Sequence, residues 1–220
     1  MTKRALAHIG MALIAIFTIA VLGLSVWYGG LAAWSDASAL RPRWVVGQWR
    51  EGKGPVYTEA IWQQTHDDLQ AALRLTPDNA QLWDDLGFLN AARAMGVADA
   101  APGAPGHELR QRLLGAAIDN FRRASALRPT FPYTWSYLAL AKHLKGDHDD
   151  EMWHAFDRAL HYGRSEAGAQ PAMAEVAFAH WATLSVERKS GIMAMLGEAP
   201  AKPRQRLVAL AKEYAVTLPE

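Results

Sequence analysis

A run of histidine and acidic residues between positions 143 and 154 has the residue types in this sequence that are best suited to chemistry. Imidazole and carboxylate groups bind Zn²⁺ and iron, and Glu151-x2-His154 has the spacing of half of a carboxylate-bridged di-iron site. That site needs a second Glu-x2-His, which the sequence lacks, as it lacks His-Glu-x2-His. Aspartate is also a common residue of turns and of helix N-termini. We therefore expect a structural run, with a metalloenzyme as the alternative, centred on His143, His148, Glu151 and His154.

No other residue pattern predicts catalysis or a bound cofactor. The sequence has no cysteine, which excludes disulfides, thiolate metal ligands and a cysteine nucleophile. No serine lies in a Gly-x-Ser-x-Gly motif. The glycines at 103 and 106 are not followed by the Gly-Lys-Ser/Thr of a phosphate-binding loop. We expect a protein that is not an enzyme and that binds neither a metal nor a cofactor.

The charge of the chain argues against nucleic-acid binding. Its 220 residues carry a formal net charge of +1. Without Lys3 and Arg4, which precede the first apolar stretch, 21 of the 23 basic residues remain against 22 acidic ones. A domain that is close to neutral and has no basic stripe lacks the electrostatic footprint of a nucleic-acid-binding protein.

The stretch from Leu6 to Tyr28 predicts a transmembrane helix. Its 23 residues include no charged residue, and at about 1.5 Å per residue they span about 34 Å, enough for a hydrocarbon core of about 30 Å. Trp27 lies where an interfacial aromatic belt is expected. Basic residues before the stretch favour a cytoplasmic N-terminus, so we expect a single-pass membrane protein with an exported C-terminal domain. A signal peptide cleaved after Leu31-Ala32-Ala33 is the alternative, although the apolar run is longer than the usual signal.

The chain is expected to be all-α and to fall into four parts. Apolar residues at helical spacing predict about seven or eight helices and no strand after the connector. In the connector, Pro42 and Gly47 are expected to interrupt any regular helix. The parts are a transmembrane anchor at 1–35, a connector at 36–57, helical repeats at 58–163 and capping helices at 164–220.

Several helix ends can be placed from single residues. Thr58 is expected to cap the first helix of the repeats. Pro132 suits the first turn of a later helix, and Lys145-Gly146-Asp147 suits a turn. Near the C-terminus we expect a helix from Gln170 to Leu184, and Ser185 is the expected cap of the next.

A pattern of large and small residues occurs twice in the repeats. Trp83, Leu86 and Gly87 are followed by an Ala-x3-Phe-x2-Ala-x4-Pro segment, and Trp135 begins a second copy. This order resembles the tetratricopeptide repeat, a helix-turn-helix unit that stacks into an α-solenoid. The resemblance implies that the repeats pack through Trp83, Leu86, Gly87, Ala117, Phe121, Ala124, Pro129, Trp135, Leu138, Phe156 and Ala159.

The first copy is longer than the repeat it resembles. Trp83 and Pro129 lie 46 positions apart, against about 28 in a repeat of about 34 residues. The surplus is the stretch 96–107, which is rich in glycine, alanine and proline. We expect it to be a mobile loop between two helices.

The resemblance also assigns a partner-binding face, because the first helix of each tetratricopeptide unit lines a concave groove. Two acids and two tyrosines at these positions favour a neutral or weakly basic polypeptide over a C-terminal carboxylate. An ordinary solvated helix face is the alternative. The positions carried over are Gln81, Asp84, Asp85, Phe88, Tyr133, Ser136, Tyr137, Leu140 and His143.

Three longer segments follow the N-terminal anchor: Ala72 to Asn79 (ALRLTPDN), Arg128 to Trp135 (RPTFPYTW) and Ala159 to Gly163 (ALHYG). With the anchor, they resemble the VpsP-type family of polysaccharide-biosynthesis accessory proteins. The resemblance implies a single-pass protein of the bacterial inner membrane with a periplasmic C-terminal domain. It also implies a non-enzymatic scaffold that binds a protein of the machinery for exopolysaccharide synthesis or export. A chaperone-like assembly factor for another envelope system, such as cytochrome maturation, pilus assembly or division, is the alternative.

Overall fold

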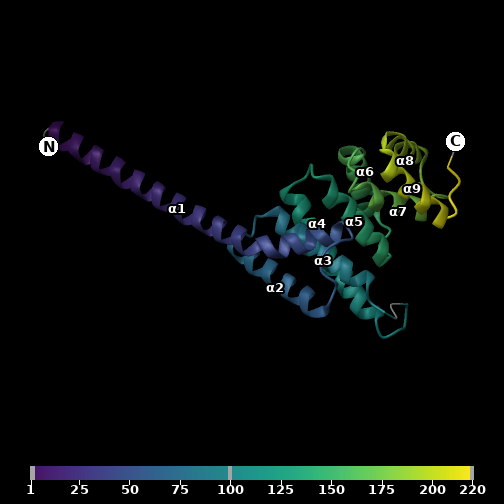
Figure 1. Cartoon of the computed structure of the whole chain (residues 1–220). Helices are drawn as coiled ribbons and strands as arrows, with labels where there is room; N and C mark the ends of the chain where they lie inside the picture. The colour runs from purple at the N-terminus through teal and green to yellow at the C-terminus, as the bar shows by residue number, and fades with distance from the viewer. Residues whose placement is uncertain (1–2, 99–100, 219–220) are drawn as a thin grey trace. The chain divides into compact units, whose positions relative to one another are not determined.

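The computed structural model describes residues 3–98 and 101–218, which form nine helices and no strand (Figure 1). The all-α prediction is confirmed for these residues. The chain divides into two compact units, Met1–Pro77 with helices α1 and α2, and Asp78–Glu220 with α3 to α9. The helices are α1 (Lys3–Arg50), α2 (Glu59–Leu75), α3 (Ala80–Met95), α4 (His107–Leu127), α5 (Pro132–Lys145), α6 (Asp150–Gly163), α7 (Gln170–Ala179), α8 (Val186–Glu198) and α9 (Ala201–Glu213).

The first unit is a helix hairpin in which α2 returns along the C-terminal part of α1. Ser35 of α1 is fully buried and donates a hydrogen bond of 3.0 Å to the backbone carbonyl of Ala72 in α2. Its hydroxyl also lies 2.6 Å from the hydroxyl of Thr76. Thr58 caps α2 by accepting a hydrogen bond from the Ile61 amide, as its residue type predicts.

Helix α1 continues through most of the predicted connector, so the expected break within 36–57 is wrong up to Arg50. Proline removes one backbone hydrogen bond from a helix, and this disfavours Pro42 at an interior position. Pro42 is nevertheless buried, four residues before the buried Val46. Packing of one helix face outweighs local propensity here, as it does in most protein helices.

Gly52, rather than Pro42 or Gly47, ends α1. Its φ of +68° lies in the left-handed region that favours glycine. The Gly52 amide donates to the carbonyl of Trp49, and the Lys53 amide donates to that of Gln48. This pair of bonds is the Schellman arrangement that closes a helix C-terminus.

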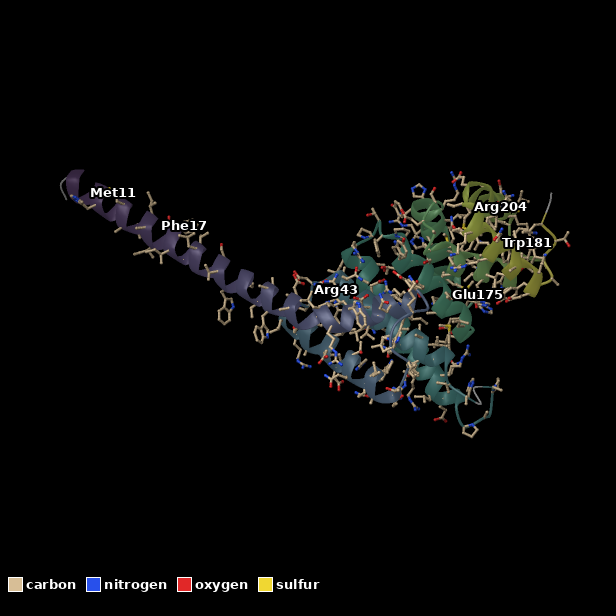
Figure 2. All side chains as sticks on the ribbon, viewed as in Figure 1. Met11, Phe17, Arg43, Glu175, Trp181 and Arg204 are labelled. Carbon is tan, nitrogen blue, oxygen red and sulfur yellow. The ribbon has the colours of Figure 1, made fainter. Side chains whose placement is uncertain are left out.

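The N-terminal part of α1 is exposed. From Gly10 onward, α1 contains a window with a mean hydropathy of 2.2 and no buried residue. Met11 and Phe17 are 60% and 70% exposed, and both side chains point outward from the ribbon in Figure 2. Among the described residues, this helix alone is long and apolar enough to cross a membrane.

The second unit begins with two helix hairpins, α3–α4 and α5–α6, and α4 also contacts α5. Helix α7 packs on α5, and both α8 and α9 contact α7. Helix α2, which the sequence analysis assigned to the repeats at 58–163, belongs instead to the first unit. The stretch 96–107 joins α3 to α4, but residues 99 and 100 lie outside the described residues, so its mobility stays a prediction.

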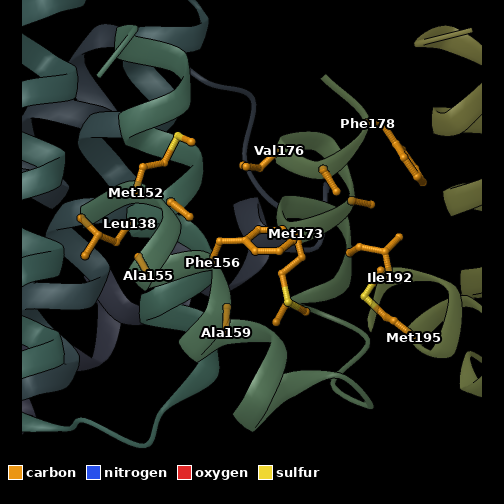
Figure 3. Close-up of a cluster of buried hydrophobic side chains, with 14 of the residues drawn as sticks. Leu138, Met152, Ala155, Phe156, Ala159, Met173, Val176, Phe178, Ile192 and Met195 are labelled. Atoms are coloured by element: carbon orange, nitrogen blue, oxygen red, sulfur yellow. The ribbon is translucent and has the colours of Figure 1, made fainter. Parts of the chain in front are cut away.

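All the helices from α4 to α9 contribute side chains to the core of the second unit. Figure 3 shows Leu138 of α5, Met152 and Phe156 of α6, Met173 of α7 and Ile192 of α8 in one cluster. Each of these side chains is at most 1% exposed. Burial of each large apolar side chain contributes about 1.5–3 kcal/mol relative to leaving it exposed.

Gly87 allows α3 and α4 to approach closely. A Cβ atom built on Gly87 would lie 2.5 Å from the ring of Phe121, which is fully buried. Among the other residues predicted to pack the repeats, Trp83 and Trp135 are half-buried and Pro129 is exposed. The structure buries the remainder, which are Leu86, Ala117, Ala124, Leu138, Phe156 and Ala159.

Candidate functional site

The predicted binding face lies on α3 and α5, which contact each other, but part of it is inaccessible. Asp84, Asp85 and Ser136 are at most 3% exposed, so their assignment to an open groove is wrong. The reason is that α3 is covered by both α4 and α5, which leaves it a narrower free side than a helix at the edge of a stack.

The buried acids serve the packing of α3. The Thr134 hydroxyl of α5 donates a hydrogen bond of 2.6 Å to Asp84 Oδ1, and both side chains are fully buried. The Gln81 amide donates to Asp85 Oδ1 at 2.9 Å, and Arg128 donates to Gln81 Oε1 at 3.3 Å. The sequence suggested that these carboxylates favour a neutral or weakly basic partner. Because both are buried, they do not select one.

Three members of the predicted face with large apolar surface are half-buried and pack against the core of the second unit, and we call Phe88, Tyr137 and Leu140 the aromatic face. The Phe88 ring meets the Tyr137 ring edge-on, with centroids 5.7 Å apart. The buried ring of Phe121 lies behind Tyr137 at 5.9 Å, so that Tyr137 has a rigid support. Leu140 follows Tyr137 by one helical turn, on the same side of α5. The aromatic face therefore offers apolar surface with one phenol hydroxyl.

Tyr133 extends this side of α5 toward its N-terminus but has an intramolecular partner. Its hydroxyl donates a hydrogen bond of 3.0 Å to Glu166 Oε2. Burial, followed by that hydrogen bond and the carboxylate charge, raises the pKa of Tyr133 above its ordinary value. We therefore expect Tyr133 to position the segment after α6 rather than a partner.

Glu151 of α6 binds both a buried lysine of α5 and an arginine of α4. Lys142 is 1% exposed, and its Nζ lies 2.6 Å from Glu151 and 2.9 Å from Asp149. Arg122 of α4 donates to both carboxylate oxygens of Glu151, at 2.6 and 2.7 Å. The hydrogen bond from Arg122, with that from Lys142, outweighs burial and lowers the pKa of Glu151 to about 2. Burial lowers the pKa of Lys142, but its bonds to Glu151 and Asp149 exceed that effect and raise it overall.

The structure separates the residues of the alternative metalloenzyme. Glu151 is held by two cations, and His154 packs edge-on against the Trp135 ring at 5.7 Å. His143 and His148 do lie together, with ring centroids 5.4 Å apart. The Glu-x2-His pair is therefore not part of the cluster that these two histidines begin.

His180 joins His143 and His148, and the sequence analysis did not single it out. Its Nε2 lies 3.0 Å from Nδ1 of His143, which is 37 positions earlier in the chain. Helix α7 ends at Ala179 rather than at the predicted Leu184, and this earlier end makes His180 the C-terminal cap. The spacing of residues in the sequence does not indicate that His180 lies beside His143, because the packing of α7 on α5 brings the two together.

No family model matches this chain, and no curated protein matches it. The resemblances to tetratricopeptide repeats and to the VpsP-type family therefore gain no support from relatives.

Proposed function

We propose that this protein is a membrane-anchored scaffold whose second unit binds another protein through the aromatic face. The first unit supplies the anchor, and the helix hairpins of the second unit supply a rigid binding surface. The bound segment is a polypeptide with apolar side chains. It belongs to a protein of exopolysaccharide synthesis or export.

The exposed side chains of α1 support the anchor. A soluble protein gains stability by covering large apolar residues, yet Met11 and Phe17 are largely exposed. Trp27 lies at the end of the apolar stretch and Trp34 lies beyond it, as an interfacial belt would, and they are 65% and 70% exposed. The positions of Lys3 and Arg4 in the sequence favour a cytoplasmic N-terminus, so we propose a periplasmic second unit.

The approach of α3 to α4 at Gly87 is the observation that carries the scaffold proposal. The tetratricopeptide pattern requires a small residue opposite the large aromatic residue of the second helix, and Gly87 faces Phe121 in this way. The second hairpin buries Leu138 and Phe156 at the matching positions of the pattern. Stacked hairpins of this kind present extended surfaces to other chains.

The aromatic face supports a protein partner rather than a small ligand. Aromatic rings are enriched at protein interfaces, because each offers large apolar area with little side-chain entropy to lose. Tyr137 rests on a buried ring, so little further ordering is needed when a partner packs on it. No charged side chain belongs to the face, which favours an uncharged segment of the partner.

In-cell photo-crosslinking tests the proposal. A benzophenone amino acid replaces Phe88 or Tyr137 in the full-length protein, and adducts are identified by mass spectrometry. Tyr214, an exposed tyrosine at the end of α9, is the matched control position. We expect an adduct with an envelope protein from the first two positions and none from Tyr214.

The identity of the adduct separates the alternatives. A glycosyltransferase, polymerase or export protein supports the exopolysaccharide pathway. A component of cytochrome maturation, pilus assembly or division keeps the scaffold and supports the alternative of an assembly factor for that system. If neither position gives an adduct beyond that of the control, the aromatic face is a solvated surface and the binding proposal fails.

The anchor and its orientation need a separate measurement. Carbonate extraction should leave the full-length protein in the membrane, whereas a variant that lacks residues 1–34 should be released. A C-terminal alkaline phosphatase fusion should be active, because that enzyme works only after export. The intact mass of the extracted protein decides between an uncleaved anchor and a signal peptide cleaved after Ala33.

A further inference from the structure

Three histidines from separate segments of the second unit converge at one point. His143 lies in the last turn of α5, His148 lies in the turn before α6, and His180 follows α7. One ring nitrogen from each lies within 4.8 Å of the other two. His143 and His180 are half-buried, whereas His148 is exposed, so solvent reaches the cluster from the side of His148.

The spacing of the nitrogen atoms suits one divalent metal ion. In a tetrahedral zinc site with Zn–N bonds of about 2.0–2.1 Å, ligand nitrogens lie about 3.3 Å apart. Nδ1 of His143 and Nε2 of His180 are already 3.0 Å apart. The other nitrogen–nitrogen distances are as long as 4.8 Å and would have to shorten to about 3.3 Å. Rotation or a small shift of the exposed His148 ring can provide this change.

The surroundings of His143 and His180 disfavour the charged form of both rings. Burial, followed by the nearby His180 and His148, lowers the pKa of His143 to about 4. Burial and His148 also lower the pKa of His180. The 3.0 Å hydrogen bond between His143 Nδ1 and His180 Nε2 places a proton on one of these two nitrogens, and metal binding needs the tautomer in which that proton lies on the other nitrogen of its ring.

Backbone groups around the cluster favour a cation and orient one ligand. Both α5 and α7 end at the cluster, and the C-terminal end of a helix carries partial negative charge. His148 Nε2 lies 3.3 Å from the backbone carbonyl of His143. When Nε2 donates its proton there, Nδ1 carries the lone pair, and metal-binding histidines commonly have such a backbone partner.

The segments that hold the rings are themselves fixed. Gly146, with a φ of +91°, closes α5 and turns the chain back toward α6, which sets the distance between His143 and His148. On the opposite side, the Trp153 ring of α6 meets the His180 ring edge-on at 5.3 Å. A metal would then join α5, the α5–α6 turn and the end of α7 without a large rearrangement.

We propose that His143, His148 and His180 form a three-histidine site for Zn²⁺ or a similar divalent transition metal, with water in the fourth position. Nitrogen ligands suit Zn²⁺, Ni²⁺ and Cu²⁺, whereas Mg²⁺ and Ca²⁺ prefer oxygen. The site excludes Glu151 and His154, which the sequence pattern had offered as ligands. The inference is independent of the scaffold proposal, since it concerns different residues and a different ligand.

Zinc titration of the full-length protein tests the site. The protein is prepared in detergent without a polyhistidine tag, treated with EDTA, dialysed and titrated with ZnCl₂ by isothermal calorimetry. We expect one Zn²⁺ per chain and a rise in melting temperature of about 5–10 °C at a hundredfold excess over Kd. Co²⁺ in place of Zn²⁺ should give the visible absorption of a four-coordinate ion.

His148→Gln is the decisive variant, and His154→Gln is its matched control. His148 is exposed, so its replacement should leave the metal-free melting temperature unchanged. It should weaken Zn²⁺ binding by more than the ~10–100-fold that loss of an outer-shell partner costs, and remove the Co²⁺ absorption. H154Q should bind as the wild type does, and H180Q should behave as H148Q.

Two results would overturn the site. The first is absence of stoichiometric Zn²⁺ binding by the wild-type protein. The second is unchanged binding in H148Q, since the three-nitrogen site would then be incomplete. Loss of binding in H154Q, with H148Q unaffected, would move the metal to the Glu-x2-His pair and equally contradict this site.

Discussion

Replacing Gly87 by alanine should destabilise the α3–α4 hairpin, whereas the same change at Gly115 of α4 should stabilise it. The new methyl group at Gly87 would lie 2.5 Å from the buried ring of Phe121, and overpacking of this kind costs about 1–3 kcal/mol. The Gly115 position has no atom within 4 Å outside its own helix turn and chain neighbours. Each substitution also gains about 0.5–1 kcal/mol of helix propensity. That gain cancels in the comparison, so the two variants should differ by about 1–3 kcal/mol.

Hydrogen exchange followed by mass spectrometry measures this difference in the full-length protein. Peptides from α3 and α4 report the local opening free energy, whatever the first unit does. Amides there should exchange about 5- to 150-fold faster in G87A than in G115A, since about 1.4 kcal/mol corresponds to a factor of ten. Adding Phe121→Leu should recover part of the loss in G87A, with a coupling energy of about 1 kcal/mol or more. Equal exchange in G87A and G115A, or strict additivity with F121L, would refute the close approach of the two helices.

Three further outcomes follow from the polar contacts of the second unit. Glu151→Gln should cost about 1–2 kcal/mol, because it removes a charged partner of the buried Lys142 while Glu151 itself is partly exposed. Arg122 and Lys142 lower the pKa of Glu151 to about 2, so its contribution to stability should be complete above about pH 4.5 and be lost as the pH falls toward 2. Urea unfolding across that range should show a steeper loss in the wild type than in E151Q. Thr134→Val should cost about 1–3 kcal/mol, because the buried Asp84 loses its 2.6 Å donor.

Each of these variants has a matched control. Glu108→Gln removes an exposed pair with Arg112, whose atoms are 3.6 Å apart, and should change stability by less than about 0.5 kcal/mol. Ser136→Ala removes a buried hydroxyl that donates only within its own helix, to the Tyr133 carbonyl, and should cost less than T134V. If E151Q is no worse than E108Q, the carboxylate does not hold α4 to the hairpin. If T134V is no worse than S136A, the bond between α5 and α3 adds nothing to stability.

The helices of the second unit could be predicted because their signals are local. Asparagine, aspartate and serine are common residues at a helix start, and the side chains of Asn79, Asp149 and Ser185 each accept a backbone hydrogen bond from the helix that follows. Of these caps, Ser185 is the one predicted from the sequence. Pro132 stands in the first turn of α5, and Gly146 closes it in the left-handed conformation. These residues act within about four positions of themselves, so one sequence is sufficient to find them.

The errors occur where packing decides against a local preference. Proline is disfavoured in the interior of a helix, but α1 continues through Pro42 because one face of this part of the helix is buried. Asp84 has the polarity of a surface residue but is buried, and Thr134, 50 positions away, donates a hydrogen bond to it. Burial decides the place of both residues, and burial depends on the tertiary fold, so neither could be placed from local sequence.

His180 shows the same limit at a candidate site. The apolar residues around His180 predict a helix that continues to Leu184. His180 would then be an interior residue of that helix and not its end. The end of α7 at Ala179 releases His180 into the space beside His143. A search for metal motifs by spacing could therefore recover two of the three ligands and would select Glu151 as the next, which Arg122 already holds.

The scaffold and the metal site can be tested apart, because different residues carry them. H148Q removes a metal ligand that lies in the turn after α5 and is no member of the aromatic face. The crosslinking positions Phe88 and Tyr137 change the aromatic face and contribute no ligand. If crosslinking from Tyr137 persists in H148Q, partner binding does not require the metal. If it disappears while the metal-free stability is unchanged, the metal orders α5 for its partner, because His143 lies on that helix fewer than two turns beyond Tyr137.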